Sequence, residues 1–229
     1  MKTISRISKI YSLSLLVSGL FIFSTSSYAA QEEKFDSTLA LGGEVHYYSL
    51  TNSKMEGLEI GFDSTTALTA KLDYRPLRDW AVKVGLTSFE TDMEVGIDER
   101  FEHYGSFKQT TISATLLYMS ETSKKSPYKM FIGGGLSYHF NDIEKDNQSA
   151  YISDFFAKNR TISKVENSLG IHGTIGFKYV LSDHLRIGAL LSLSATEAKA
   201  DVTYPDSSVR ESDLSLNAIS IGTGLEYQF

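Results

Sequence analysis

Residues 214–229, LSLNAISIGTGLEYQF, alternate strictly between two kinds of side chain. Every second position from Ile219 to Phe229 is aliphatic, aromatic or threonine, and the positions between them are small or polar. Successive side chains of a β-strand point to opposite faces, so this alternation predicts a strand with one apolar face. An open edge on such a strand promotes aggregation in water. A closed barrel in a bilayer pairs both edges and turns the apolar face to lipid, and the stretch favours that fold.

Seven further stretches alternate in the same way, which gives eight predicted strands. The other strands are predicted at residues 39–50, 66–76, 80–92, 108–120, 128–140, 165–181 and 185–195. Long loops are predicted at 51–63, 93–107, 141–161 and 196–212, and short turns at 76–79, 121–127 and 182–184. Alternating long and short connections are typical of bacterial outer-membrane barrels. The predicted fold is therefore all-β: an eight-stranded antiparallel transmembrane β-barrel with short periplasmic turns and longer extracellular loops.

The two faces of the predicted strands differ in a way that sets their orientation. Aromatic residues share the apolar face and gather at its two ends, as interfacial girdles do. They are Tyr74, Trp80, Tyr118, Tyr128, Tyr179, Tyr227 and Phe229 toward the short turns, and Tyr47, Tyr138 and Phe140 toward the long loops. Charged residues occupy the other face, where they are expected to pair inside a narrow lumen as a charge plug. The predicted plug consists of Lys71, Asp73, Arg75, Lys83, Lys129, Lys178, Arg186 and Glu226. A soluble up-and-down barrel would show the opposite orientation.

The first 29 residues have the pattern of a secretory signal peptide. Three basic residues precede a mainly apolar stretch at residues 10–23, and Ser27-Tyr28-Ala29 provides a small-residue cleavage site. Cleavage after Ala29 would leave residues 30–229 as one barrel domain. The chain has a formal net charge of −6, which argues against nucleic acid as a partner, and it contains no cysteine. Its five histidines show no metal-binding spacing, so neither a metal nor another cofactor is expected.

Three segments give the chain a resemblance to the OmpW-like outer-membrane proteins. Residues 126–142, SPYKMFIGGGLSYHFND, are similar to the fifth strand of that family. Residues 167–179, NSLGIHGTIGFKY, resemble its sixth strand, and residues 72–81, LDYRPLRDWA, resemble its first periplasmic hairpin. The similarity runs from about residue 39 to 229. It departs from the family where a proline pair often precedes the fourth strand and at Leu169, where an aromatic residue is common.

The resemblance implies a narrow, largely apolar pocket or channel, open to the outside, for uptake or efflux of small hydrophobic molecules without enzymatic activity. Candidate ligand-binding residues on the inward face are Tyr48, Phe89, Phe131 and Leu190. Phe155 and Phe156 lie with Ile152 at helical spacing in the longest loop, where a short amphipathic turn is expected to line or gate the pocket. The expected surroundings are outer-membrane lipid and lipopolysaccharide. Tyr227 and Phe229 resemble the terminal signature that the barrel-assembly machinery reads.

Two other functions remain open from the sequence. A surface-recognition or adhesion barrel would extend its strands well beyond the membrane, and the polar residues 196–204 permit such an extension. A lipid A-modifying barrel enzyme would need a serine, a histidine and an acid close together. Ser137 and His139 share a face, and Glu166 lies on the neighbouring predicted strand. No sharp nucleophile turn surrounds Ser137, so the chain is not predicted to be an enzyme.

Overall fold

The computed structural model describes residues 37–55, 58–97, 100–121, 127–145, 161–204 and 206–229. The predicted signal peptide, residues 1–29, lies outside this part of the chain. The described residues form twelve strands, and no helix among them is long and apolar enough to cross a membrane. The strands are β1 (Thr38–Leu50), β2 (Ser53–Met55), β3 (Leu58–Phe62), β4 (Thr65–Leu77), β5 (Trp80–Ile97), β6 (Arg100–Glu121), β7 (Tyr128–Lys145), β8 (Thr161–Val165), β9 (Ser168–Val180), β10 (Leu185–Thr203), β11 (Val209–Ser215) and β12 (Ala218–Gln228).

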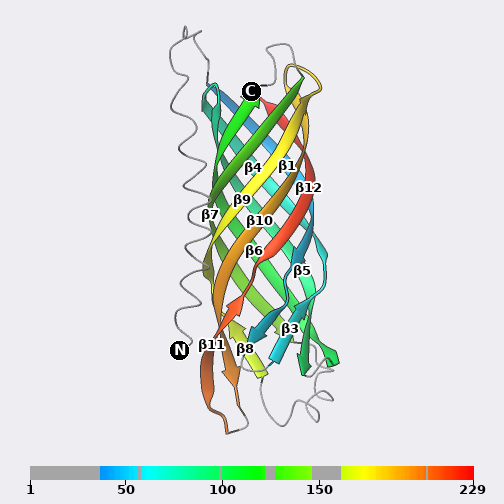
Figure 1. The fold of residues 1–229 in the computed structure, drawn as a ribbon, viewed down its shortest axis with the longest axis vertical. Coiled ribbons are helices and arrows are strands. Elements are labelled where there is room, and N and C mark those ends of the chain that lie inside the picture. Colours follow the sequence, from blue (N-terminus) through cyan, green and yellow to red (C-terminus); the bar gives the residue numbers. More distant parts are fainter. Residues whose placement is uncertain (1–36, 56–57, 98–99, 122–126, 146–160, 205) are drawn as a thin grey trace, which may run out of the picture. The chain divides into compact units, whose positions relative to one another are not determined.

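Eight of these strands close into an antiparallel ring. The ring order is β1, β4, β5, β6, β7, β9, β10 and β12, and β12 pairs with β1 to complete it. Figure 1 shows the tilted strands of this ring, with the C-terminus at the end that carries the short turns. Pairing at the seam is continuous from Ala40–Gln228 to Leu50–Ala218, so the last strand has no free edge over that length. The predicted eight-stranded transmembrane barrel fold is confirmed.

The predicted long loops are wrong over much of their length, because the strands continue there. β5 and β6 remain paired as far as Ile97 and Arg100, through the loop predicted at 93–107. β2 and β3 occupy much of the loop predicted at 51–63, and β3 pairs with β5. Both β8 and β11 pair with the far part of β10, so the segment 196–212 is also largely strand.

The two faces of the long strands exchange their chemistry along the strand, although the inward and outward positions keep the same alternation. On β10, Leu191 and Leu193 point outward and are exposed, and Ser192 and Ser194 point into the ring. A few residues further on, Glu197 and Lys199 point outward. The inward residues at this level are Ala198, Ala200 and Val202, which are fully buried. The ring thus has an apolar exterior toward the short turns, here called the band, and a charged exterior beyond it, here called the extension.

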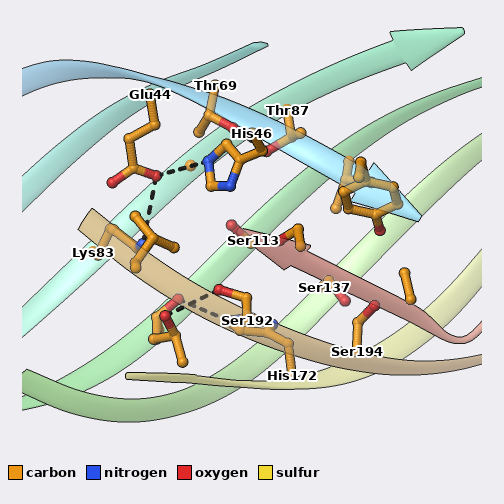
Figure 2. Close-up of a pocket in the computed structure, with 18 of the residues that line it drawn as sticks. Glu44, His46, Thr69, Lys83, Thr87, Ser113, Ser137, His172, Ser192 and Ser194 are labelled. Atoms are coloured by element: carbon orange, nitrogen blue, oxygen red, sulfur yellow. Dashed lines mark hydrogen bonds and ion pairs between the residues drawn. The ribbon is translucent and has the colours of Figure 1, made fainter. Parts of the chain in front are cut away.

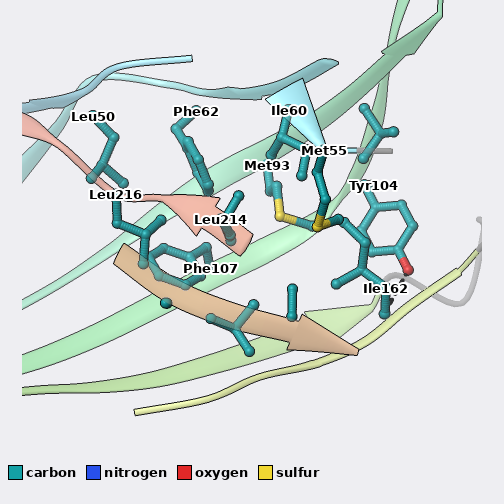
Figure 3. Close-up of a cluster of buried hydrophobic side chains, with 14 of the residues drawn as sticks. Leu50, Met55, Ile60, Phe62, Met93, Tyr104, Phe107, Ile162, Leu214 and Leu216 are labelled. Atoms are coloured by element: carbon teal, nitrogen blue, oxygen red, sulfur yellow. Dashed lines mark hydrogen bonds between the residues drawn. The ribbon is translucent and has the colours of Figure 1, made fainter. Parts of the chain in front are cut away.

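The extension contains its own hydrophobic core. It comprises β2, β3, β8 and β11 with residues 89–97 of β5, 103–109 of β6, 141–145 of β7 and 197–203 of β10. The buried side chains of this apolar cluster come from β2, β3, β5, β6, β8, β10 and β11, and the partly buried Ile143 of β7 packs against them. Figure 3 shows the cluster around Phe107. They include Met55, Ile60, Phe62, Met93, Phe107, Ile162, Leu214 and Leu216. Apolar residues inside and charged residues outside are the arrangement of a water-soluble β-structure.

One tyrosine links two strands of this cluster through its hydroxyl group. Tyr104 of β6 is 9% exposed, and its hydroxyl donates a hydrogen bond of 2.8 Å to the carbonyl of Ile162 on β8. Burial raises the pKa of the Tyr104 phenol to about 12, although the hydrogen bond acts in the opposite direction. The phenol therefore remains neutral at physiological pH and can donate this hydrogen bond.

Gly135 allows β6 and β7 to approach closely in the band. A Cβ at Gly135 would overlap the carbonyl oxygen of Ala114 and lie 2.8 Å from the Cα of Thr115. We expect Gly135→Ala to lower the free energy of unfolding by about 1–3 kcal/mol, because backbone must shift to relieve the overlap. Denaturant unfolding in lipid vesicles measures this change. Gly173→Ala on β9 is the matched control, since its Cβ would have its nearest contact at 3.9 Å. Equal losses in both variants would contradict the prediction.

Candidate lumenal site

A network of charged side chains fills the lumen toward the short turns. The lumenal charge network consists of Glu44, Lys71, Asp73, Lys83, Lys178, Arg186 and Glu226. Lys178 Nζ lies 2.7 Å from a carboxylate oxygen of both Asp73 and Glu226. Lys71 Nζ lies 2.9 Å from Glu44 and 3.1 Å from Glu226. Each of the five side chains in these four pairs is at most 8% exposed, so the ion pairs are shielded from water.

The structure brings six of the eight predicted plug residues into this network. Of the other two, Arg75 donates a hydrogen bond to the Arg78 carbonyl, and Lys129 is half-buried opposite Lys178. Glu44 joins these six residues in the network, although it is not among the predicted plug residues. Without Glu44, Lys71 would lose its shortest ion pair.

A cavity of about 100 Å³ lies in the middle of the ring, between the charge network and the apolar cluster. Figure 2 shows the side chains that surround it. Hydroxyl and imidazole groups make up most of its lining: Thr69, Thr87, Thr111, Ser113, Thr115, Ser137, Thr174, Ser192, Ser194, Ser220, His46, His139 and His172. Glu44, Lys83, Tyr48, Leu190, Ala218 and Gly85 complete it. Most of these residues bear hydroxyl groups, while Leu190, Ala218 and the hydrocarbon parts of the threonines also give the cavity apolar surface.

The predicted ligand-binding residues fall into different surroundings. Tyr48 and Leu190 line the cavity. Phe89 is buried in the apolar cluster, and its ring packs against Tyr48 with the centroids 4.5 Å apart. Phe131 lies in a smaller buried cluster with Leu190, where the Lys178 ammonium is 5.8 Å from its ring centroid. Phe155 and Phe156 lie outside the described residues, so their proposed gating role stays a prediction.

His139 is the centre of a hydrogen-bonded group on the cavity wall. Its Nε2 lies 2.8 Å from Ser137 Oγ and 3.1 Å from Thr196 Oγ1, and its Nδ1 lies 2.9 Å from Thr111 Oγ1. A nucleophilic serine would need an acid on the second imidazole nitrogen, and a threonine hydroxyl takes that place here. The side chain of Glu166 instead lies 3.9 Å from Lys164 on β8. The structure therefore joins Ser137 to His139 but not to Glu166.

Within the described part of the chain, no group of three or more histidine, aspartate or glutamate side chains is arranged to hold a metal ion. A second, polar hollow of about 420 Å³ lies where the pairing of β7 with β9 ends at His139–Ser168. Its lining runs from Asn141 to Ile143 on β7 and from Ser163 to Asn167 beside it. Asn141 crosses this hollow with a hydrogen bond of 2.8 Å to the Glu166 carbonyl.

Comparison with known proteins places the fold among small outer-membrane barrels. No protein-family model matches the sequence, and no curated protein matches it either. The outer-membrane protein OprG from Pseudomonas aeruginosa is 20% identical with a TM-score of 0.68, and the match covers 88% of this chain and 99% of OprG. The outer-membrane protein AlkL, solved in lipid bilayers, is 11% identical with a TM-score of 0.58, covering 90% and 96%. Neisserial surface protein A is 14% identical with a TM-score of 0.54, covering 85% and 100%.

These likenesses define a class of fold: the small transmembrane β-barrel found in proteins of the bacterial outer membrane. The ring of eight strands, the apolar band and the charged lumen are the features of that class present in this chain.

Proposed function

We propose that this chain is a barrel of the Gram-negative outer membrane that binds small hydrophobic molecules in its lumen and passes them across that membrane. The cavity in the middle of the ring carries this proposal. Tyr48 and Ala218 belong both to its lining and to the apolar cluster or its immediate contacts. An apolar molecule that passes through the extension would therefore contact apolar side chains continuously as far as the cavity. The resemblance to OmpW-like proteins favours the same function.

The outer surface supports the membrane location. Large apolar side chains on the outward face of every ring strand are exposed, and such a surface is unfavourable in water. Tyr74, Tyr118 and Tyr128 are exposed at the short-turn end of the band, and Tyr47, Tyr138 and Phe140 at the other end. In this proposal outer-membrane lipid and lipopolysaccharide surround the band, and the short turns face the periplasm. The assembly machinery would read the exposed Tyr227 and Phe229.

A variant that fills the cavity tests the proposed function. We expect benzene to bind the refolded barrel in nonionic detergent, measured by calorimetric titration, and Leu190→Trp to abolish binding because the larger side chain occupies the cavity. Leu191→Trp on the outward face is the matched control and should bind as the parent does. In planar bilayers the parent should show no wide-channel conductance, since the charge network and the apolar cluster fill the lumen on both sides of the cavity. Binding that survives Leu190→Trp would overturn the proposal.

The extension favours a second candidate, recognition of a partner at the cell surface. β5, β6, β7 and β10 have 18, 22, 18 and 19 residues, more than the 9–11 or so that a tilted strand needs to span a bilayer. The outward residues of the extension are charged, and they include Lys54, Glu90, Glu144, Lys199 and Glu211. Cells carrying charge-reversed outward residues would lose attachment to host cells or matrix if this candidate holds, while benzene binding by the purified barrel stays unchanged.

A further inference from the structure

The lumenal charge network contains one cation more than its carboxylates neutralise. Within the described residues of the network, Glu44, Asp73 and Glu226 face four cations. Three of these cations lie within 3.5 Å of a carboxylate. Lys71 contacts Glu44 and Glu226, and Lys178 contacts Asp73 and Glu226. Arg186 lies 3.5 Å from Glu226. The fourth is Lys83.

Lys83 has the weakest pairing in the network. Its Nζ lies 3.8 Å from Glu44 Oε2, and that same oxygen is 3.2 Å from His46 Nε2. The other oxygen of Glu44 contacts Lys71. Among the described residues, Lys83 Nζ makes no hydrogen bond, although the side chain is only 11% exposed. An ammonium group held inside a protein without a close counter-charge is costly, and an anion beside it would remove that cost.

An anion bound in the cavity would lie beside Lys83. Lys83 is part of its wall, and Figure 2 shows the side chain at the Glu44 end of the cavity, with the hydroxyl residues Ser113 and Ser192 among those beyond it. The hydroxyl groups of Thr87 and Ser113 line the same space and can donate to a carboxylate oxygen. Leu190 lines it too, and provides apolar surface away from the charge. A cation, hydroxyl donors and an apolar wall together match a carboxylate with a short hydrocarbon part.

We propose that the mid-barrel cavity binds small monocarboxylates, with the Lys83 ammonium pairing the carboxylate and the apolar part directed toward Leu190 and Tyr48. This proposal rests on the proposed function and names the class of molecule that the lumen prefers. The volume of about 100 Å³ limits the ligand to a few carbon atoms. A metal cation is disfavoured here, because the network already carries excess positive charge.

Butyrate and butyramide form the test pair, since they have the same shape and differ in charge. We expect calorimetric titration of the refolded barrel in nonionic detergent and low-salt buffer to show butyrate binding more tightly than butyramide. Lys83→Met should weaken butyrate binding by about tenfold or more, the loss typical of a charge-assisted hydrogen bond, and leave butyramide within about twofold. Lys54→Met is the control, because it removes a lysine whose side chain is 81% exposed, in the extension. The mobility of the folded barrel in gel electrophoresis confirms that each variant has folded.

The outcomes separate this proposal from the function it rests on. Butyrate that binds no tighter than butyramide, or equally well to the Lys83→Met variant, overturns the carboxylate preference, while benzene binding would still support the proposed function. Failure of benzene, butyramide and butyrate to bind the parent overturns both. Chloride that displaces butyrate at equal concentration would also overturn it, since the site would then select charge alone. Tight butyrate binding that is lost in Lys83→Met and retained in Lys54→Met supports the proposal.

Discussion

Glu226→Gln is expected to destabilise the barrel by about 3–5 kcal/mol, the usual cost of removing one partner from a buried ion pair. Glu226 contacts Lys71 at 3.1 Å, Lys178 at 2.7 Å and Arg186 at 3.5 Å, and its side chain is only 3% exposed. The amide keeps the shape but leaves the four cations of the network with two carboxylates. Guanidinium unfolding in lipid vesicles, followed by fluorescence of the single tryptophan, Trp80, measures the loss.

Two further variants test whether charge balance is the cause. Glu59→Gln removes the partner of the exposed Lys54, 2.6 Å away, and should cost no more than about 1 kcal/mol. Adding Lys71→Met to Glu226→Gln restores the original excess of one cation in the network, and the double variant should be more stable than the two separate losses predict. Additive losses in the double variant would mean that the individual hydrogen bonds, and not the balance of charge, hold this end of the lumen together.

Phe107→Ala should destabilise the extension by about 3–5 kcal/mol, the typical cost of emptying a buried phenylalanine site. Phe107 is fully buried, and its ring centroid lies 5.3 Å from that of Phe62 and 6.5 Å from that of Phe89. Because the band is held by its own pairing and by lipid, we expect the loss to appear locally. Amide hydrogen exchange should accelerate in β3 and β11 and remain slow in β12 at the seam.

Val209→Ala is the control for this experiment. Val209 begins β11 and is 58% exposed, so its truncation leaves no cavity. Exchange in β3 and β11 should then match that of the parent. If Phe107→Ala accelerated exchange equally in the seam strands, the extension and the band would unfold as one unit, contrary to the expectation.

The sequence predicted the strands of the band well because lipid and lumen impose opposite chemistry on alternate residues. It failed beyond the band, where residues 93–107, rich in glutamate and glycine, were predicted to form a loop. The period-two alternation continues there, with Phe89, Met93 and Val95 buried between acidic residues. The alternation was present, but its apolar residues point inward and its charged residues outward, because the solvent around those strands is water instead of lipid.

The lumenal site was predictable in kind but not in pairing. The charged residues that point inward could be identified, because the face of each residue follows from the alternation along its own strand. Their partners depend on register between distant strands: Lys178 and Asp73 are 105 residues apart, and Lys71 and Glu226 are 155 apart. Tyr48 and Leu190 were predicted to line a pocket, but most of the cavity wall was missed because it consists of serine and threonine, which are common on strands and mark no site by themselves.

The change of polarity along each face of β10 also protects the barrel against misassembly. A strand that slips by one residue turns all of its side chains to the opposite face. On β10 such a slip would move Leu191 and Leu193 into the polar lumen and, at the same time, force Glu197 and Lys199 into the packed cluster. The energetic costs of the two errors add, because one half of the strand lies in lipid and the other half in water. In a strand that crosses from lipid into water, both the part in lipid and the part in water therefore disfavour a slipped register.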